Sequence, residues 1–484
     1  MTVSLWWIRR DFRLADNQTL ATALAESEHV YPIFILDPKL INSDYTGQKR
    51  LAFMFEGLRH LAADLQARGS YLTLYEGDVA AQLEKLLSET RAEAIYAQED
   101  FSPYARHRDK QVAESLPLRL VPGLTLHHPT AVLKSDGDPY TVFTPYSRTW
   151  KKQPLPETAD LRSAPKSIST PKGLKGVDIP DKPALDEAVP FPASEKEAQQ
   201  RLYSFTGQIS RQPWAFKAAS VNKINTIYAY EETRDRTDLK GTSQLSPYLR
   251  FGMISARQAV VAALKASEKA DDSDAANGAA IWLNELIWRD FYIAILYHFP
   301  YVRQSSFREK YNQVPWINNE DDFEAWCRGK TGYPVVDAGM RQLVESGWMH
   351  NRARMIVAAF LVKHLLIDWR WGERFFMQHL VDGDPAANNG GWQWTAGTGT
   401  DAPPYFRVFN PILQGEKFDP DGAYIRCWVP ELANVPDKYI HTPWKMPTEI
   451  QHEANCRIGQ DYPKPLVEHK EARQRALAAY DQVK

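Results

Sequence analysis

Residues 278–299 read GAAIWLNELIWRDFYIAILYHF, and this stretch decides the class of the larger part of the fold. Its polar and aromatic residues recur at steps of three and four, which places one set on one face of a helix: Trp282, Glu285, Trp288, Arg289 and Tyr292. A carboxylate flanked by two indoles suits a pocket that stacks flat rings and hydrogen-bonds their polar edges. The alternative is a surface ion pair between Glu285 and Arg289 beside buried aromatic side chains.

Helical patterns continue on the C-terminal side of this stretch, whereas strand patterns nearly vanish after about residue 195. Residues 335–345, 352–366 and 373–380 have the apolar periodicity of helices, and Gly347 is expected to end one helix before the next begins. We therefore predict an all-α domain over residues 197–484.

Toward the N-terminus, over residues 1–131, short apolar runs alternate with helical stretches. The predicted strands are residues 3–8, 30–36, 71–75, 94–96 and 118–121. The predicted helices are residues 18–27, 48–68, 79–90 and 106–115. Because neighbouring parallel strands need crossover connections, this alternation predicts an α/β, doubly wound parallel-sheet domain. It contains neither GxGxxG nor GxxxxGK[ST], so the usual sign of a nucleotide site is missing.

Between these parts, the composition predicts a Pro-rich interdomain connector over residues 132–196. Eight of the 43 residues from 152 to 194 are proline, which cannot sustain helix or ladder hydrogen bonding. Connectors of this length are usually laid over the surface or disordered.

Charge and cysteine content exclude several classes of protein. The 58 Lys and Arg residues nearly balance 60 Asp and Glu residues, so a nucleic-acid binder would have to concentrate its basic residues locally. Cys327, Cys427 and Cys456 are widely spaced, and neither a disulfide framework nor a metal site is expected. No signal-peptide core and no bilayer-length apolar run occurs, so we expect no membrane association and a cytoplasmic location.

Three further segments contain residues typical of a cofactor site. GWMHNRARM (347–355) puts Asn351 and Met355 on one helix face, although a solvated basic helix start with Met355 in the core is an equal alternative. VDGDPAANNGGWQW (381–394) brings two carboxylates next to small residues that permit close approach of a ligand. It does not match the calcium loop, and its carboxylates can pair with Arg or accept from ribose; a structural turn is the alternative. GTSQLS (241–246) is a plausible phosphate cradle, but Ser and Thr also commonly cap helices.

Taken together, these motifs resemble the DNA photolyases of the photolyase/cryptochrome family, in particular the class I cyclobutane pyrimidine dimer photolyases. The resemblance runs through WIRRDFRLADNQTL, GTSQLSPYLRFG, WLNELIWRDFY, GKTGYPVVDAGMRQL, GWMHNRARM and DGDPAANNGGWQW, in that order. It covers nearly the whole chain apart from the connector. It implies an α/β antenna domain and a helical domain that binds U-shaped FAD, whose photoexcited reduced form donates an electron to a pyrimidine dimer flipped out of DNA.

The resemblance assigns residues to FAD, to the lesion and to an electron relay. The implied FAD contacts are Tyr230, Thr242, Ser243, Gln244, Leu245, Ser246, Trp282, Arg289, Arg354, Asp382, Gly383, Asp384 and Asn388. Asn388 would face flavin N5, and Arg354 would pair with Asp382. Glu285, Asn351 and Met355 would touch the dimer, with a protonated Glu285 as hydrogen-bond donor.

Tryptophans take two further roles under the same resemblance. Trp288 and Trp394 would form the apolar wall for the flipped bases, while Arg234 would bind a backbone phosphate. Trp392, Trp369 and Trp316 match the family's relay from flavin to surface. Core packing is the alternative for the 12 Trp residues that lie beyond residue 200, out of 15 in the chain.

The sequence also departs from the family pattern and leaves alternatives open. Pro385 stands where Leu is expected, and Gln244 where Arg often occurs. A six-four photolyase would need His at the positions of Asn351 and Met355, and a cryptochrome often changes the Asn at position 388 and carries a long C-terminal extension. A nicotinamide-dependent flavin oxidoreductase would need a second nucleotide site, which we do not find.

The antenna chromophore is the least defined prediction. Leu36, Arg50, Asp100 and Arg250 favour a deazaflavin over methenyltetrahydrofolate, although Ser102 replaces an expected acid. A second flavin or an empty pocket is the alternative. Damaged DNA is the expected partner of a chain that acts as a monomer, with no obligate protein partner.

Overall fold

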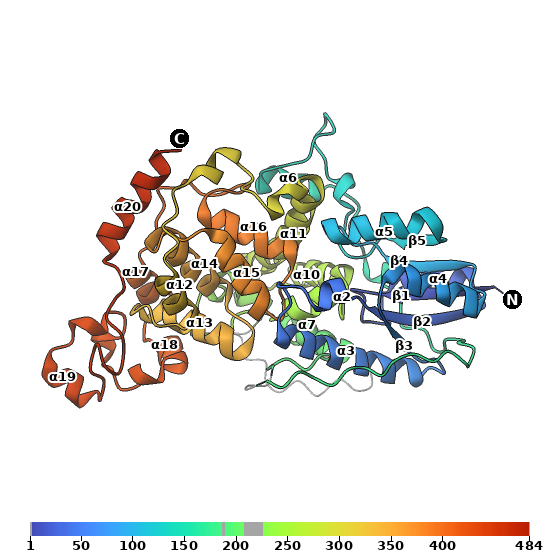
Figure 1. Cartoon of the computed structure of the whole chain (residues 1–484), viewed down its shortest axis with the longest axis horizontal. Coiled ribbons are helices and arrows are strands. Elements are labelled where there is room, and N and C mark those ends of the chain that lie inside the picture. Colours follow the sequence, from blue (N-terminus) through green and yellow to red (C-terminus); the bar gives the residue numbers. More distant parts are fainter. Residues whose placement is uncertain (1, 186–188, 208–225, 484) are drawn as a thin grey trace.

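The computed structural model describes residues 2–185, 189–207 and 226–483. A small α/β part with the N-terminus lies beside a larger helical part with the C-terminus (Figure 1). Among the described residues, no helix is both long enough and apolar enough to cross a membrane.

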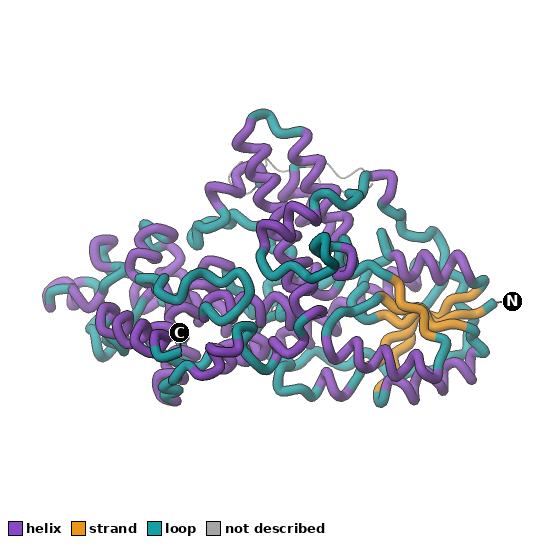
Figure 2. The backbone as a smooth tube through the Cα atoms, turned by 90° about the horizontal axis from the view of Figure 1, so that it is seen from above, coloured by secondary structure: helices purple, strands orange, loops and turns teal. Residues whose placement is uncertain are grey.

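The N-terminal part is a five-stranded parallel sheet with the strand order β3-β2-β1-β4-β5. The strands are β1 (Val3–Ile8), β2 (His29–Leu36), β3 (Thr73–Glu76), β4 (Ala94–Gln98) and β5 (Leu118–Val121). The helices are α1 (Gln18–Glu26), α2 (Pro38–Ile41), α3 (Gln48–Gln66), α4 (Val79–Thr90) and α5 (Pro103–Ser115). Helices cover both faces of the sheet (Figure 2), which confirms the predicted doubly wound class.

Two adjacent tryptophans of β1 show how the sheet joins the rest of the molecule. Side chains alternate along a strand, so Trp6 packs in the core cluster that includes α1, α3 and the helical part, while Trp7 packs in the cluster with α4 and α5. Both indoles are buried. The core is therefore continuous from the sheet into the helical part through the Trp6 face.

Among the described residues, the Pro-rich connector contains the helix α6 (Phe143–Trp150) and a 3₁₀ helix at Thr158–Asp160. Its later part binds the sheet domain through backbone hydrogen bonds, from Ile168 N to Arg68 O at 2.9 Å and from Val30 N to Ser169 O at 3.0 Å. The Trp150 Nε1 donates to Asp290 Oδ2 at 3.1 Å, which attaches α6 to the helical part. The predicted domain boundaries themselves remain a prediction.

The helical part contains the remaining elements. They are α7 (Glu195–Thr206), α8 (Tyr230–Thr233), α9 (Ser246–Phe251), α10 (Ala256–Glu268), α11 (Ser273–His298), α12 (Glu320–Cys327), α13 (Pro334–Ser346), α14 (Asn351–Ala359), α15 (Trp369–His379), α16 (Pro385–Ala396), α17 (Pro411–Phe418), α18 (Ala423–Trp428), α19 (Thr448–Glu453) and α20 (His469–Asp481). Helix α11 packs against α8, α10 and α16, and α14 packs against α16. The mostly helical class is as predicted.

One predicted helix differs from the structure. Residues 352–366 were expected to form one α-helix, but α14 ends at Ala359 and continues as a π-helical turn over Phe360–His364. Such turns place an extra residue in the helical ladder and often occur at functional positions. Here the turn buries Lys363, whose Nζ donates to Ala396 O at 2.9 Å.

Candidate FAD and lesion site

The predicted lesion residue Glu285 lies on α11 and pairs with Arg234. Arg234 Nη1 lies 2.8 Å from Glu285 Oε1, and both side chains are partly exposed. Arg289, in contrast, donates to Leu124 O at 2.9 Å and lies 3.5 Å from Asp290 Oδ1. The alternative of a Glu285–Arg289 ion pair is therefore wrong, because the two side chains leave the helix toward different partners.

Burial raises the pKa of Glu285, and the Arg234 guanidinium opposes that rise. A raised pKa is what a hydrogen-bond-donating Glu285 requires. Burial therefore favours the protonated Glu285 carboxyl, and the Arg234 guanidinium favours its ionised form.

On α14, Asn351 is exposed and Met355 is partly exposed, so Met355 is not a core residue. They are the first and fifth residues of the helix and share a face. Arg354 points elsewhere: its Nε donates to Met349 O at 2.9 Å and its Nη2 to Asp382 Oδ2 at 2.8 Å. The predicted Arg354–Asp382 ion pair is present.

Asp382 carries a buried polar atom without a partner. Its side chain is 3% exposed, Oδ2 is bonded to Arg354, and Oδ1 is buried without a hydrogen bond among the described residues. A buried carboxylate oxygen left unpaired is costly unless a ligand supplies a donor. Asp382 Oδ1 can therefore accept a hydrogen bond from a ligand next to the Arg354 guanidinium. The polar edge of a ring with an N–H group would supply such a donor.

Asp384 caps the N-terminus of α16 and is bound by arginines from two parts of the chain. Its Oδ1 accepts from the backbone N–H of Ala386 at 2.9 Å, and its Oδ2 lies 2.6 Å from Arg10 Nη2. Burial alone would raise the pKa of Asp384, but the guanidiniums of Arg10, Arg250 and Arg289 hold it well below its usual range. Asp384 is therefore a permanent anion at the interdomain junction.

Three of the four predicted antenna residues lie at this same junction. Arg50 donates to Met377 O at 2.6 Å and Leu380 O at 2.9 Å, and Arg250 donates to Gly383 O at 2.8 Å. Asp100 follows β4 and faces Arg10, which follows β1, at 3.6 Å. Leu36 is buried at the end of β2.

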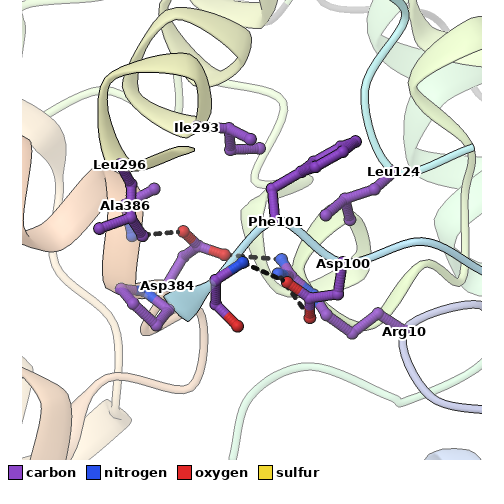
Figure 3. A pocket seen from close by; sticks show the side chains of 10 residues that line it. Arg10, Asp100, Phe101, Leu124, Ile293, Leu296, Asp384 and Ala386 are labelled. Carbon is purple, nitrogen blue, oxygen red and sulfur yellow. Dashed lines mark hydrogen bonds and ion pairs between the residues drawn. The ribbon is translucent and has the colours of Figure 1, made fainter. Parts of the chain in front are cut away.

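Figure 3 shows Arg10 between Asp100 and Asp384 at the edge of a cavity of about 10 Å³. The cavity lies where strands β1 and β4 end, the switch point of the strand order at which open α/β sheets bind ligands. Its volume suits about one water molecule. A planar chromophore at this junction would have to displace the side chains that now fill it.

Three further predicted FAD contacts are Asn388 on α16, Tyr230 and Trp282. Asn388 is partly buried, and its Nδ2 donates to the Glu373 backbone O at 2.9 Å. Tyr230 at the start of α8 and Trp282 on α11 are both buried, and each packs against the ring of Phe205. These two aromatic residues therefore lie together beside the ring of Phe205.

The GTSQLS loop precedes α9 and has the open polar groups expected of a phosphate cradle. Within residues 2–185, 189–207 and 226–483, the backbone N–H groups of Thr242 and Ser243 donate no hydrogen bond. Leu245 is buried, whereas the other loop side chains from Thr242 to Ser246 are at least partly exposed. Gln244 has φ of 51° and accepts from Arg201 Nη1 at 2.9 Å. Arg201 thus brings a guanidinium to the loop position where the family often has Arg.

Small residues were expected to admit a ligand close to the backbone of α16, and at Gly390 the structure gives a different reason. A Cβ atom at Gly390 would lie 2.1 Å from the ring of Tyr292 on α11. Gly390 therefore lets two helices approach each other. At Gly391 a Cβ atom would meet nothing within 4 Å, so this glycine lies beside open space.

The two wall tryptophans differ in their surroundings. Trp288 is stacked on Phe143 of α6, with ring centroids 3.7 Å apart and planes 3° apart. One face of the Trp288 indole is therefore covered, which the sequence pattern did not indicate. Trp394 near the end of α16 is partly exposed.

The predicted relay tryptophans run from buried to partly exposed positions. Trp392 and Trp369 are 2% and 1% exposed, and Trp316 is partly exposed. The Trp392 ring lies against Gly372, where a Cβ atom would come within 2.1 Å of it, and Trp369 is one turn earlier on the same face of α15.

The segment with Trp316 is fixed beside the start of α15, because Asp368 N donates to Asn318 Oδ1 at 2.8 Å. Trp326, which the sequence did not single out, also contacts Trp392, with centroids 6.1 Å apart. Trp392 therefore has an indole neighbour, Trp326, that is not one of the three predicted relay residues.

The residues present fit an FAD molecule by three observations. Asp382 Oδ1 and Trp392 Nε1 are buried polar atoms without partners among the described residues. The loop at Thr242 offers amides for phosphates, and Asn388 offers an amide oxygen. Among the same described residues, no group of three or more His, Cys, Asp and Glu could hold a metal ion.

Comparison with known proteins gives full-length matches. The family model for the FAD binding domain of DNA photolyase matches residues 282–482, and that for DNA photolyase matches residues 4–165. The deoxyribodipyrimidine photo-lyases of Synechococcus and Escherichia coli are 40% and 39% identical to this chain. These matches cover 99% of this chain and 96% and 99% of the relatives, respectively.

Solved structures agree in fold over the same length. A bacterial class III photolyase from Agrobacterium tumefaciens has a TM-score of 0.90 and 38% identity, covering 100% of this chain and 97% of its own. An archaeal photolyase from Sulfolobus tokodaii with two FAD molecules has a TM-score of 0.80 and 33% identity. That match covers 99% of this chain and 100% of the archaeal chain. A Synechocystis cryptochrome has a TM-score of 0.86 and 28% identity, and the match covers 99% of both chains.

Proposed function

This chain belongs to the DNA photolyase family of light-dependent DNA repair enzymes, and we propose that α11, α14 and α16 together bind FAD and a cyclobutane pyrimidine dimer. The observation that carries the proposal is the buried Oδ1 of Asp382, which has no hydrogen-bond partner among the described residues and lies beside the Arg354 guanidinium. FAD, when bound and reduced, supplies the light-excited electron donor that opens the cyclobutane ring.

For the flavin, Arg354 and Asp382 would bind the polar edge of the ring, and Asn388 would face its N5 position. The phosphates would lie over the loop from Thr242 to Ser246, where the backbone N–H groups of Thr242 and Ser243 donate no hydrogen bond within the described part of the chain. The remaining proposed contacts are Tyr230, Trp282, Arg289, Gly383 and Asp384.

For the lesion, Glu285 would donate a hydrogen bond to a base carbonyl on which negative charge develops. Asn351 and Met355 would contact the dimer from α14, while Trp288 and Trp394 would flank it. Phe143 covers one face of the Trp288 indole and the Tyr292 ring is also stacked on it, with centroids 5.5 Å apart, so a base would contact the part of this indole that stays exposed.

Arg234 would change partner when DNA binds. In the free protein its guanidinium lies 2.8 Å from Glu285 and opposes the rise in the pKa of that carboxyl. If Arg234 moves to a backbone phosphate, the opposing charge leaves and the protonated form of Glu285 is favoured. Phosphate binding and the donor role of Glu285 are thereby coupled.

Trp392, Trp369 and Trp316 would carry electrons between the flavin and the surface during photoreduction. Their order from buried to partly exposed positions supports this role. Trp326 beside Trp392 is a further aromatic neighbour that packs in the core.

The antenna chromophore remains a prediction, with a deazaflavin favoured over methenyltetrahydrofolate. The charged junction of Arg10, Asp100 and Asp384 leaves room for about one water, so an antenna there requires side chains to move. An absorption spectrum of the natively purified protein tests this point, since a folate-like near-UV band would contradict a deazaflavin. We also expect a monomer that acts on damaged DNA in the cytoplasm.

A blue-light photoreceptor is the second candidate, because the Synechocystis cryptochrome shares the fold at a TM-score of 0.86. The two functions are separated by one experiment, in which fully reduced protein is mixed with dimer-containing duplex DNA. Repair under blue light but not in darkness is the expected result. DNA binding without repair would favour the photoreceptor.

A further inference from the structure

The connector helix α6 contributes an aromatic ring to the wall around Trp288. Phe143, the first residue of α6, stacks on the Trp288 indole, with ring centroids 3.7 Å apart and planes 3° apart. Both rings also meet Phe291 of α11 edge to face, at interplanar angles of 79° for Phe143 and 81° for Trp288. Phe291 is 0% exposed. The stacked pair therefore rests on a side chain that is fixed in the core.

Hydrogen bonds hold α6 at both of its ends. At the N-terminal end the backbone N–H of Phe143 donates to Asp401 Oδ2 at 3.4 Å, in the segment that follows α16. At the C-terminal end the buried Trp150 donates through Nε1 to Asp290 Oδ2 on α11 at 3.1 Å. Helix α6 also packs along α11 (Figure 1). Phe143 is therefore presented by an element that is fixed to the helical part.

Stacking on Phe143 restricts the rotation of an indole that is not fully buried. Trp288 is partly exposed, and Tyr292 is the second ring stacked on it, with centroids 5.5 Å apart and planes 30° apart. A side chain that becomes ordered only when a ligand binds lowers the affinity, because its rotational entropy is lost in the complex. An indole that is already held in one plane avoids most of that loss.

We propose that Phe143 is a positioning residue for the lesion, which fixes the plane of the Trp288 indole so that a flipped dimer stacks on the part of that ring that stays exposed. This role rests on the proposed function, in which Trp288 flanks the dimer. It gives the connector between the two domains a part in recognising damage. If Phe143 instead occupied the place of a base, it would have to leave when DNA binds, which the anchored ends of α6 oppose.

Phe143→Leu tests the proposal because leucine keeps an apolar side chain but offers no flat ring to the indole. Dissociation constants of the FAD-loaded protein are measured in darkness for a duplex with one thymine dimer and for the same duplex without it. We expect the preference for the dimer to fall by about twofold to tenfold, the range for one aromatic pair. Affinity for the undamaged duplex should stay unchanged, since it depends on phosphate contacts. An unchanged or increased preference overturns the positioning role.

Tyr146→Leu is the matched control on the same helix. Tyr146 is buried and packs on Phe291, with centroids 5.2 Å apart, whereas the ring stacked on Trp288 from α6 is that of Phe143. This control weakens the attachment of α6 without uncovering the indole, so we expect a lower thermal unfolding temperature and an unchanged dimer preference. An equal fall in preference in both variants overturns the specific role of Phe143. At saturating DNA, the repair yield and FAD content of Phe143→Leu should match wild type.

A double-mutant cycle with Trp288→Ala identifies the route of the effect. If Phe143 acts through Trp288, Phe143→Leu lowers the dimer preference in the wild-type background and adds nothing in Trp288→Ala. An equal fall in both backgrounds, or a fall in Trp288→Ala with none in Phe143→Leu, overturns the positioning role alone. An unchanged preference in Trp288→Ala contradicts the proposed place of Trp288 beside the dimer, and the positioning role with it.

Discussion

The two ends of helix α16 are built from different chemistry. At its N-terminal end Asp384 is matched by cations, with Arg10 at 2.6 Å and Arg250 at 3.9 Å. At its C-terminal end the Lys363 ammonium donates to Ala396 O at 2.9 Å and lies 3.6 Å from the ring centroid of Tyr480. Among the described residues, Lys363 has no carboxylate partner.

Under the proposed function, this difference would separate ligand binding from electron transfer along one helix. The charged end joins the sheet domain to the segment of Asp382 and Asp384, so its polar atoms are fixed before a ligand arrives. The other end is packed with aromatic side chains around Trp392, where few charges need solvation. We infer that ligand affinity depends on the first end and photoreduction on the second.

The largest expected effect comes from breaking the charged end. Asp384→Ala leaves buried guanidiniums without their anion, and we expect the free energy of unfolding in urea to fall by about 3–5 kcal/mol. As a control, Glu89→Gln removes one side of an exposed pair with Lys85, where we expect a change below about 0.5 kcal/mol. Equal changes in the two variants would mean that the Asp384 cluster does not stabilise the fold.

Overpacking the aromatic end should have the next largest effect. Gly372→Ala would bring a Cβ atom within 2.1 Å of the Trp392 ring, and we expect a loss of about 1–3 kcal/mol in the free energy of unfolding. Gly391→Ala is the matched control, because a Cβ atom there meets nothing within 4 Å. Removing a helical glycine at that open position should stabilise the protein slightly, and a loss as large as that at Gly372 would contradict the account.

The buried cation predicts a pH dependence. Burial lowers the pKa of Lys363 from 10.5 to about 7, so between these values the unfolded chain binds one proton more than the folded chain. Stability due to this group therefore rises with pH over that window. From pH 7.5 to 8.5, we expect the free energy of unfolding to rise by about 1 kcal/mol more in wild type than in Lys363→Met. Parallel pH profiles would show that Lys363 keeps an ordinary pKa.

The smallest expected effect on stability comes from the outer relay residue. Trp316→Phe should alter the free energy of unfolding little, because Trp316 is only partly buried. It should nevertheless slow photoreduction of bound FAD, since an indole is removed from the path. Repair by chemically reduced protein should stay near wild type. An equal loss in photoreduction and repair would contradict the relay assignment.

The sequence predicted the sheet domain well because its signals are local. Apolar strands alternate with amphipathic helices, and β1 over Val3–Ile8, α4 over Val79–Thr90 and β5 over Leu118–Val121 begin and end where expected. The π-helical turn at Phe360–His364 could not be predicted in this way. Within this turn Lys363 is buried and donates to Ala396 O, a partner that is distant in sequence and that no local pattern indicates.

In the candidate site too, contacts between residues that are distant in sequence could not be predicted from local patterns. The Arg354–Asp382 pair was implied by the family resemblance, and it is present at 2.8 Å. The partners of Glu285 and Asp384 were not predicted, because Arg234 and Arg10 reach them from other elements of the chain. Spacing along one helix favoured Arg289 as the alternative partner of Glu285, but a helix face does not show which side chain a neighbouring element supplies.

Repair by pre-reduced protein with and without the Glu285 carboxyl tests directly whether Glu285 acts on the lesion. Wild type and Glu285→Ala, both loaded with FAD, are illuminated with blue light on duplex DNA containing one thymine dimer. Dimer loss is expected in wild type only under light, with a lower yield per absorbed photon in Glu285→Ala and an unchanged FAD content. Equal yields in the two proteins, or loss of FAD from Glu285→Ala, would contradict the assignment of Glu285 to the lesion.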